Sequence, residues 1–370
     1  MEVFINQLVY FGCFLSLFLL VVYLCSAKNR KNSNGYMVFL IFVLFLGLLG
    51  RVLYTTKVFG ENFRLITISE FAILLFGSTV YLFTKSSLTN QRFMTKDLVH
   101  YVPGIAYFLF VTFYFIVPTN EVIVARIQQG ELYAVVNVLV AIGLTVNGTY
   151  WGLSLKQFLS YREKLKNELS YAVKTQFFLN FLMAIGVCLL VWIAVYGMSL
   201  FGLETFERDA RNFIWLAIAF IILFIAYYGM IAPEVFKIEL LHLPQRKYSQ
   251  SKLDSEDLNA LKVKLEQMMV AKKPYLNSKL MKAELAQMLG VSNPDLARLL
   301  NERIGMNFFD FVNYYRIKEF IALAETHKAK ELTFFGLAQE AGFNSKTTFN
   351  KSFKNLMGSA PSEYFLKTIK

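Results

Sequence analysis

Cysteine, histidine and charged residues are scarce in this chain of 370 residues. The three cysteines, Cys13, Cys25 and Cys188, show no CxxC spacing and lie in or beside apolar runs. This pattern argues against a disulfide framework or a zinc site and favours packing as small apolar side chains. Charged residues make up 17% of the chain, whereas an average soluble domain has about 25%. The composition therefore excludes an ordinary soluble protein, and the 56% of hydrophobic residues excludes a disordered or collagen-like one.

The sequence also lacks the short motifs of the common enzyme classes. It has no HExxH, no GxSxG and no Walker-type GKS or GKT motif. The three histidines, His100, His242 and His327, are far apart in the sequence, and no cysteine follows residue 233. We therefore expect a protein that is not an enzyme and that has no catalytic residue, no cofactor and no metal ligand.

Long apolar runs recur along the first part of the chain, which is rich in phenylalanine and tyrosine. Each run has 19–24 residues, and they cover 3–24, 36–54, 65–83, 99–117, 132–155, 177–200 and 213–231. A bilayer core of about 30 Å needs about 20 helical residues, and unpaired backbone groups in lipid favour helices. Residues 1–232 are therefore predicted to form a seven-helix transmembrane domain.

The loops between these runs differ in positive charge, and this difference predicts the orientation. Loops 25–35, 84–98 and 156–176 together carry eleven Lys and Arg, and the alternate loops carry five. Because positive charge stays on the cytoplasmic side, we expect the N-terminus outside and the C-terminus in the cytoplasm.

The chain changes character near Pro233, although its net charge of +12 is shared equally between the two parts. Residues 233–253 are mixed in polarity and contain Pro244, which predicts a juxtamembrane linker. From Asp254, a possible N-cap, apolar residues at helical spacing predict a helix to about Met269. Residues 254–370 are predicted to form a second, cytoplasmic domain.

A near-repeat in this second domain is the most informative feature of the sequence. Residues 285–292 read LAQMLGVS and residues 337–345 read LAQEAGFNS. In both, a short helix is expected to end at a glycine, Gly290 or Gly342, and a serine then caps a second helix. Counted from each serine, positions four, eight and twelve are apolar, position six is basic and position thirteen is glycine. The pattern predicts two helix-turn-helix units, held apart by one long aromatic helix over about 308–325.

The outward faces of the two second helices carry hydrogen-bond donors and cations, which suit base edges and phosphates. An ordinary solvated face would explain any one of these residues, but not two copies in the same phase. We expect DNA contacts from Asn293, Arg298 and Asn301 in the first copy, and from Lys346, Thr347, Asn350, Lys351 and Lys354 in the second. The first face is less basic, and it includes Pro294 and Ala297, which cannot read a base by hydrogen bonding.

Residues 336–364 closely resemble the signature of the AraC/XylS family of bacterial transcription regulators, and the resemblance extends over about 255–367. Residues 292–315 resemble a subgroup whose domain follows several membrane spans. The resemblance implies that two recognition helices enter successive major-groove segments. By position in the motif, it points to Arg298 on the first helix and to Lys346, Thr347, Asn350 and Lys351 on the second. With the apolar helices of the first part, we expect an all-α fold.

Together these features favour a membrane-bound one-component transcription regulator in the bacterial inner membrane. Its expected partners are double-stranded DNA, the lipid bilayer, an unknown signal or ligand, and a second copy in a homodimer. The alternative is a membrane receptor or transporter whose cytoplasmic helical module binds a protein partner. Few charges and few prolines within the runs weigh against transport.

Two charges lie within the apolar runs, and by depth both fall in the outer third of the bilayer. They are Arg51 in the second run and Glu70 in the third. Such charges are costly unless they are paired or face a wet cavity. They are expected to form either a structural pair between neighbouring helices or part of an outward-facing ligand pocket.

Overall fold

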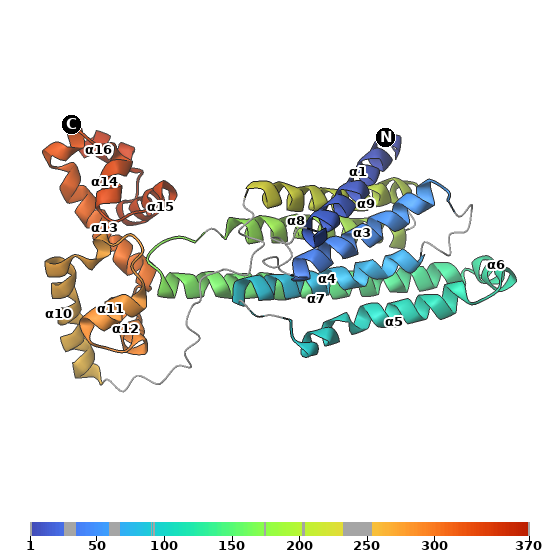
Figure 1. Ribbon diagram of the computed structural model, residues 1–370, viewed down its shortest axis with the longest axis horizontal. Coiled ribbons are helices and arrows are strands. Elements are labelled where there is room, and N and C mark those ends of the chain that lie inside the picture. The colour runs from blue at the N-terminus through green and yellow to red at the C-terminus, as the bar shows by residue number, and fades with distance from the viewer. Residues whose placement is uncertain are drawn as a thin grey trace. The chain divides into compact units, whose positions relative to one another are not determined.

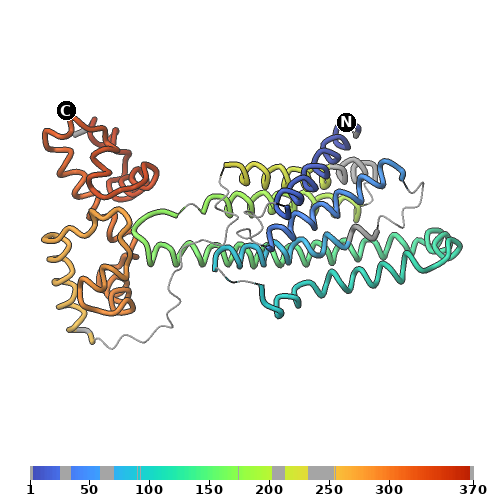
Figure 2. The backbone as a smooth tube through the Cα atoms, in the orientation of Figure 1, coloured from blue at the N-terminus to red at the C-terminus, as the bar shows by residue number. Residues whose placement is uncertain are grey.

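The computed structural model describes residues 2–25, 35–58, 67–89, 91, 93–173, 175–201, 204–231 and 254–368. Within these residues all the regular elements are helices (Figure 1, Figure 2), which confirms the expected all-α fold. The chain divides into two compact units. The first consists of Met1–Leu159 and Thr175–His242, and the second of Ser160–Lys174 and Leu243–Lys370.

The first unit contains the predicted apolar helices, and seven of the described helical segments are long and apolar enough to cross a membrane. They are α1 (Glu2–Cys25), α3 (Gly35–Thr55), α4 (Thr67–Thr89), the continuous stretch of η2 (Thr95–Tyr101), α5 (Val102–Val111) and η3 (Thr112–Ile116), α7 (Glu131–Glu168), α8 (Gln176–Leu200) and α9 (Glu204–Ile231). The short helix α6 (Asn120–Gln128) precedes α7. Helix α7 continues well beyond its apolar run, and its residues from Ser160 onward belong to the second unit.

Polar side chains connect α7 to its neighbours inside the first unit. Asn147 donates its amide to the backbone oxygen of Ile73 on α4 at 3.1 Å, and Trp151 donates its indole N–H to Leu182 on α8 at 2.8 Å. Helix α1 packs against α3 and α9, and α9 packs against α8. These contacts make one bundle of the helices.

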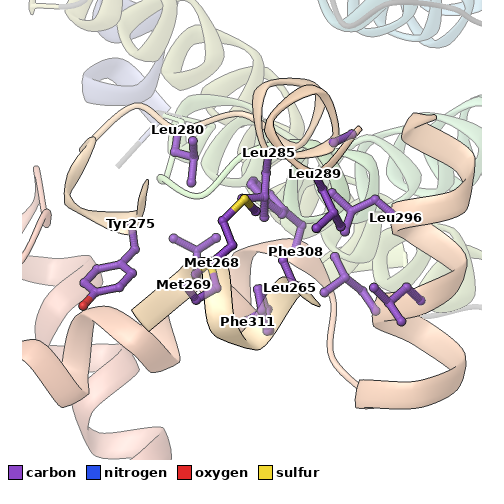
Figure 3. Close-up of a cluster of buried hydrophobic side chains, with 14 of the residues drawn as sticks. Leu265, Met268, Met269, Tyr275, Leu280, Leu285, Leu289, Leu296, Phe308 and Phe311 are labelled. Carbon is purple, nitrogen blue, oxygen red and sulfur yellow. The ribbon is translucent and has the colours of Figure 1, made fainter. Parts of the chain in front are cut away.

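The second unit is built around two hydrophobic cores. The first core includes residues of α10 (Ser255–Lys272), η5 (Pro274–Leu276), α11 (Lys282–Leu289), α12 (Asn293–Leu299), η6 (Leu300–Ile304) and α13 (Phe308–Ala324). Asp254 caps α10 as expected, because its carboxylate accepts from the backbone N–H groups of Glu256 and Asp257. Figure 3 shows Leu265, Leu285 and Phe308 among the buried side chains that point toward one another in this core.

The second core follows α13 and includes residues of α14 (Phe334–Glu340), α15 (Lys346–Met357) and α16 (Pro361–Thr368). The short helix η7 (His327–Lys330) precedes α14. Helix α13 belongs to both cores, since Phe311 and Val312 lie in the first, and Ile317 and Phe320 lie in the second. Within the second unit, Figure 1 shows α10–α12 near one end of α13 and α14–α16 near the other. The predicted long helix over 308–325 is therefore the shared element of the two cores.

The predicted linker 233–253 lies outside the described residues. So does the side chain of Glu70, whose backbone is part of α4. The expected Arg51–Glu70 pair therefore stays a prediction.

Candidate nucleic-acid interface

The first helix-turn-helix consists of α11 and α12, and local capping explains where each helix begins and ends. Gly290 follows α11 in the left-handed region, with φ of +79°, where a side chain would be strained. The hydroxyl of Ser292 then accepts the N–H of Asp295 at 3.2 Å and starts α12. Both residues act as the sequence predicts.

The second helix-turn-helix consists of α14 and α15, and it repeats this arrangement. Gly342 has φ of +97°, and the hydroxyl of Ser345 accepts the N–H of Thr348 at 3.4 Å at the start of α15. A Cβ atom on Gly342 would lie 2.3 Å from the backbone oxygen of Tyr275. Gly342 is therefore required both by the backbone conformation and by the close approach of the η5 segment.

Helix α15 has one exposed polar face and one buried aromatic face. Phe349 and Phe353 are 1% and 0% exposed. The five predicted contact residues of this copy are all exposed: Lys346, Thr347, Asn350, Lys351 and Lys354. Because the aromatic residues hold the helix in the core, these side chains are presented to solvent as one surface, which we call the α15 face.

The predicted residues of the first copy differ in their availability. Asn301, in η6, is exposed. Arg298 is 33% exposed and donates from Nε to Oε1 of Glu302 at 3.0 Å. An exposed pair at this helical spacing is worth only about 0.3–0.5 kcal/mol, so a phosphate or a guanine can replace it. Asn293 is partly buried and donates from Nδ2 to Oε2 of Glu168 at 3.3 Å.

Glu168 belongs to a segment that sequence reasoning placed in a loop between membrane helices. We call residues 160–173 the strap. Its backbone pairs with the start of α11, through an isolated bridge between Leu169 and Met281 and a 3.2 Å hydrogen bond from Ser170 N–H to the oxygen of Leu280. Leu169 and Ser170 are both 0% exposed. The strap is therefore a packed part of the second unit.

Two buried cations of the second unit take partners from the strap. The Nζ of Lys282, a residue that is 5% exposed, lies 2.6 Å from Oε1 of Glu168. The guanidinium of Arg316, which is 1% exposed, donates to the backbone oxygen of Ser170 at 2.7 Å and to its hydroxyl at 3.0 Å. Buried charge is costly unless such partners satisfy it.

Arg316 also connects the η5 segment, α13 and the second helix-turn-helix. It donates to the backbone oxygens of Tyr275 and Asn277, both at 2.8 Å, and to Oδ1 of Asn313 at 3.2 Å. Its guanidinium carbon lies 5.8 Å from the ring centre of Phe343, in the turn of the second helix-turn-helix. Burial lowers the pKa of Arg316 to about 10, so it stays protonated at neutral pH.

An ion pair lies beside this network, at the junction of η5 and α13. The carboxylate of Glu319 accepts from Lys273 Nζ at 2.8 Å and from the hydroxyl of Tyr275 at 2.9 Å. Burial alone would raise the pKa of Glu319, but these hydrogen bonds and the charge of Lys273 outweigh it and lower the pKa. Burial and the same carboxylate raise the pKa of Tyr275.

Sequence reasoning missed Glu168, Ser170 and Arg316 as functional candidates. For Arg316 a signal was present, because it lies four residues after Val312 and four before Phe320, on the core side of α13. No local signal exists for Glu168, the last residue of α7, or for Ser170, two residues beyond it.

The comparisons with known proteins concern the second unit. Residues 285–367 match the family model of a helix-turn-helix domain, of the AraC type. No curated protein and no solved structure gives a significant match to the chain. The matched range begins within α11 and includes α12, α13 and the second helix-turn-helix, so the C-terminal part of this chain is similar to a helix-turn-helix domain over both helix-turn-helix units.

Proposed function

We propose that this chain is a membrane-bound one-component transcription regulator, which binds promoter DNA through two helix-turn-helix units. The observation that carries the proposal is that one polypeptide holds both an AraC-type DNA-binding domain and seven apolar helices of membrane-spanning length. No separate messenger is then needed between the membrane and the promoter.

The surface of the first unit supports a position in a lipid bilayer. Phe4, Phe14, Phe113 and Leu190 are 68%, 68%, 69% and 66% exposed. Large exposed apolar surfaces of this kind are rare in soluble proteins and suit contact with lipid. With the charge bias of the loops, this supports a multi-pass protein of the bacterial inner membrane whose C-terminal domain is cytoplasmic.

Different positions on the two second helices suit different modes of DNA contact. Lys346, Thr347, Asn350 and Lys351 lie on the first two turns of α15, and the N-terminal part of a recognition helix is the part that contacts base edges. Lys354 lies further along the helix and suits a phosphate contact. On the first helix-turn-helix, Arg298 and Asn301 are the more accessible candidates.

The test uses the full-length protein in lipid nanodiscs and duplexes that co-purify with it from cells. Lys351→Ala is expected to weaken binding by about 1–3 kcal/mol if it contacts a base. Lys354→Ala should weaken all duplexes alike and reduce the salt slope by about 1. Lys272→Ala, an exposed lysine at the end of α10, is the matched control.

A folded full-length protein without salt-dependent duplex binding would overturn the proposal. Stable capture of a cytoplasmic protein in place of DNA would instead favour the receptor or transporter reading.

A cavity in the first unit supports the further proposal that the membrane helices sense a ligand. It has a volume of about 230 Å³ and is lined almost entirely by apolar side chains from α3, α4, α7, α8 and α9, among them Ala72 and Trp215. The guanidinium carbon of Arg51 lies 6.0 Å from the Trp215 ring centre. A cavity of this size suits a small, mainly apolar molecule, since engineered cavities of about 150 Å³ bind benzene.

Indole is a suitable probe of this cavity. It should raise the melting temperature of the purified protein, and Ala72→Phe should abolish the shift by filling the cavity. Ala125→Phe, at an exposed position on α6, should leave the shift unchanged. An equal shift in both variants would show that indole binds elsewhere.

The active protein is proposed to be a homodimer, because paired half-sites raise affinity through effective concentration. Cross-linking in native membranes should give a dimer that DNA does not abolish. Monomer alone, with and without DNA, would count against it.

A further inference from the structure

The strap is a built part of the first helix-turn-helix, although it is far from it in the sequence. Tyr161 and Leu165 on its helical part, and Leu169 directly after the helix, recur every four residues and are 6%, 7% and 0% exposed. A merely solvated loop between two membrane helices would not bury such a stripe. Burial at this spacing indicates that one side of the strap is packed specifically within the second unit.

The carboxylate of Glu168 contacts both helices of the first helix-turn-helix. Its Oε1 lies 2.6 Å from Nζ of Lys282, the first residue of α11, and its Oε2 lies 3.3 Å from Nδ2 of Asn293, the first residue of α12. One side chain thus fixes the starts of both helices relative to each other. Lys282 is buried, so the loss of Glu168 would leave a buried cation without its carboxylate.

Neighbouring backbone contacts keep Glu168 in this place. Leu169 pairs with Met281, directly before Lys282, and Arg316 holds Ser170 through two hydrogen bonds. The two side-chain contacts described for Glu168 are both with the first helix-turn-helix. The link of the second helix-turn-helix to this network is the Phe343 ring beside Arg316.

We propose that Glu168 is a positioning residue for the first recognition helix, α12. The strap must be packed against the start of α11 for α12 to bind DNA. This inference rests on the proposed function. Because α7 is one continuous helix from Glu131 to Glu168, a rotation or shift of α7 moves Glu168 away from Lys282 and Asn293. The half-site read by α12 then depends on Glu168, whereas the half-site read by α15 does not.

The test is a footprint of the full-length protein in nanodiscs on a duplex recovered with it from cells. Glu168→Ala should remove protection of the α12 half-site, retain that of the α15 half-site, and weaken overall binding about tenfold or more. The charge swap Glu168→Lys with Lys282→Glu should restore protection that each single change loses. Glu163→Ala, an exposed carboxylate on the same helix, is the matched control and should leave the footprint intact.

The outcomes separate this inference from the proposed function. Equal loss at both half-sites would mean that Glu168 only supports folding, and an unchanged footprint would mean that it positions nothing; either result overturns the inference. Retained protection by α15 in Glu168→Ala shows that the variant is folded. Absence of duplex binding by the wild-type protein would overturn the proposed function itself.

Discussion

Arg316→Met should be among the most damaging single substitutions in the second unit. Methionine keeps much of the apolar stem of the side chain but is shorter, and it removes five hydrogen bonds, three of them to backbone oxygens of Ser170, Tyr275 and Asn277 at 2.7–2.8 Å. A buried acceptor left without a partner costs about 1–3 kcal/mol. The oxygen of Asn277 still accepts from the Leu280 N–H at 3.1 Å, so the oxygens of Ser170 and Tyr275 are the two that lose their donor. Two such oxygens and the lost bonds to the side chains of Asn313 and Ser170, less some relief from no longer burying a cation, give a loss of about 4 kcal/mol in the free energy of unfolding of this unit.

This loss in stability should be measured with an assay that reports on the second unit alone. All three tryptophans, Trp151, Trp192 and Trp215, belong to the first unit, so proteolysis with cleavage sites mapped to 254–368 is the better assay. A loss of about 4 kcal/mol should lower the melting temperature of this unit by roughly 15 °C. Lys318→Met, two residues away and exposed, is the control and should cost less than about 0.5 kcal/mol.

The comparison of Arg316→Met with Ser170→Ala tests the argument further. Ser170→Ala removes the hydroxyl bonds to Arg316 and Leu280 but leaves the backbone contacts, so it should cost about 1–2 kcal/mol. A loss below about 1 kcal/mol in Arg316→Met would refute the reasoning, because it would mean that the oxygens of Ser170 and Tyr275 find other partners at no cost.

Three further predictions concern the same unit. Phe353→Ala should cost about 3–5 kcal/mol, measured by the same proteolysis, because the ring is 0% exposed in the second core; a loss under 1 kcal/mol would contradict this packing. Gly342→Ala should strongly reduce the folded yield, because of both its positive φ and the nearby Tyr275 oxygen; normal yield would show that the turn can shift. The lowered pKa of Glu319 means that the folded unit binds fewer protons than the unfolded chain, so stability should fall with acidification from just above the ordinary pKa of 4.5 downward. Glu319→Gln should make stability depend less on pH in this range. If the loss of stability at low pH is unchanged in this variant, other groups cause it.

Most of the helices, and the ends of those in the two helix-turn-helix units, could be predicted from the sequence, because their signals are local. The end of α7 could not, since the expected loop 156–176 is helical as far as Glu168. Ser292 and Ser345 satisfy N–H groups within one turn, Gly290 and Gly342 supply the positive φ that ends a motif, and the spacing of apolar residues alone places one face of a helix in the core. The same periodicity predicts which side of α15 is exposed, and the length of the apolar runs predicts the seven long helices.

Only the tertiary structure decided which side chains complete the first helix-turn-helix. Glu168 meets Lys282 and Asn293 across 114 and 125 residues, and Ser170 meets Arg316 across 146. In the sequence Glu168 is one carboxylate among many near a helix end, since its own neighbours give no sign of a distant cation. A pairing of this kind depends on how α7 and α11 pack, which is set by the sum of many weak apolar contacts and not by any pattern within one segment.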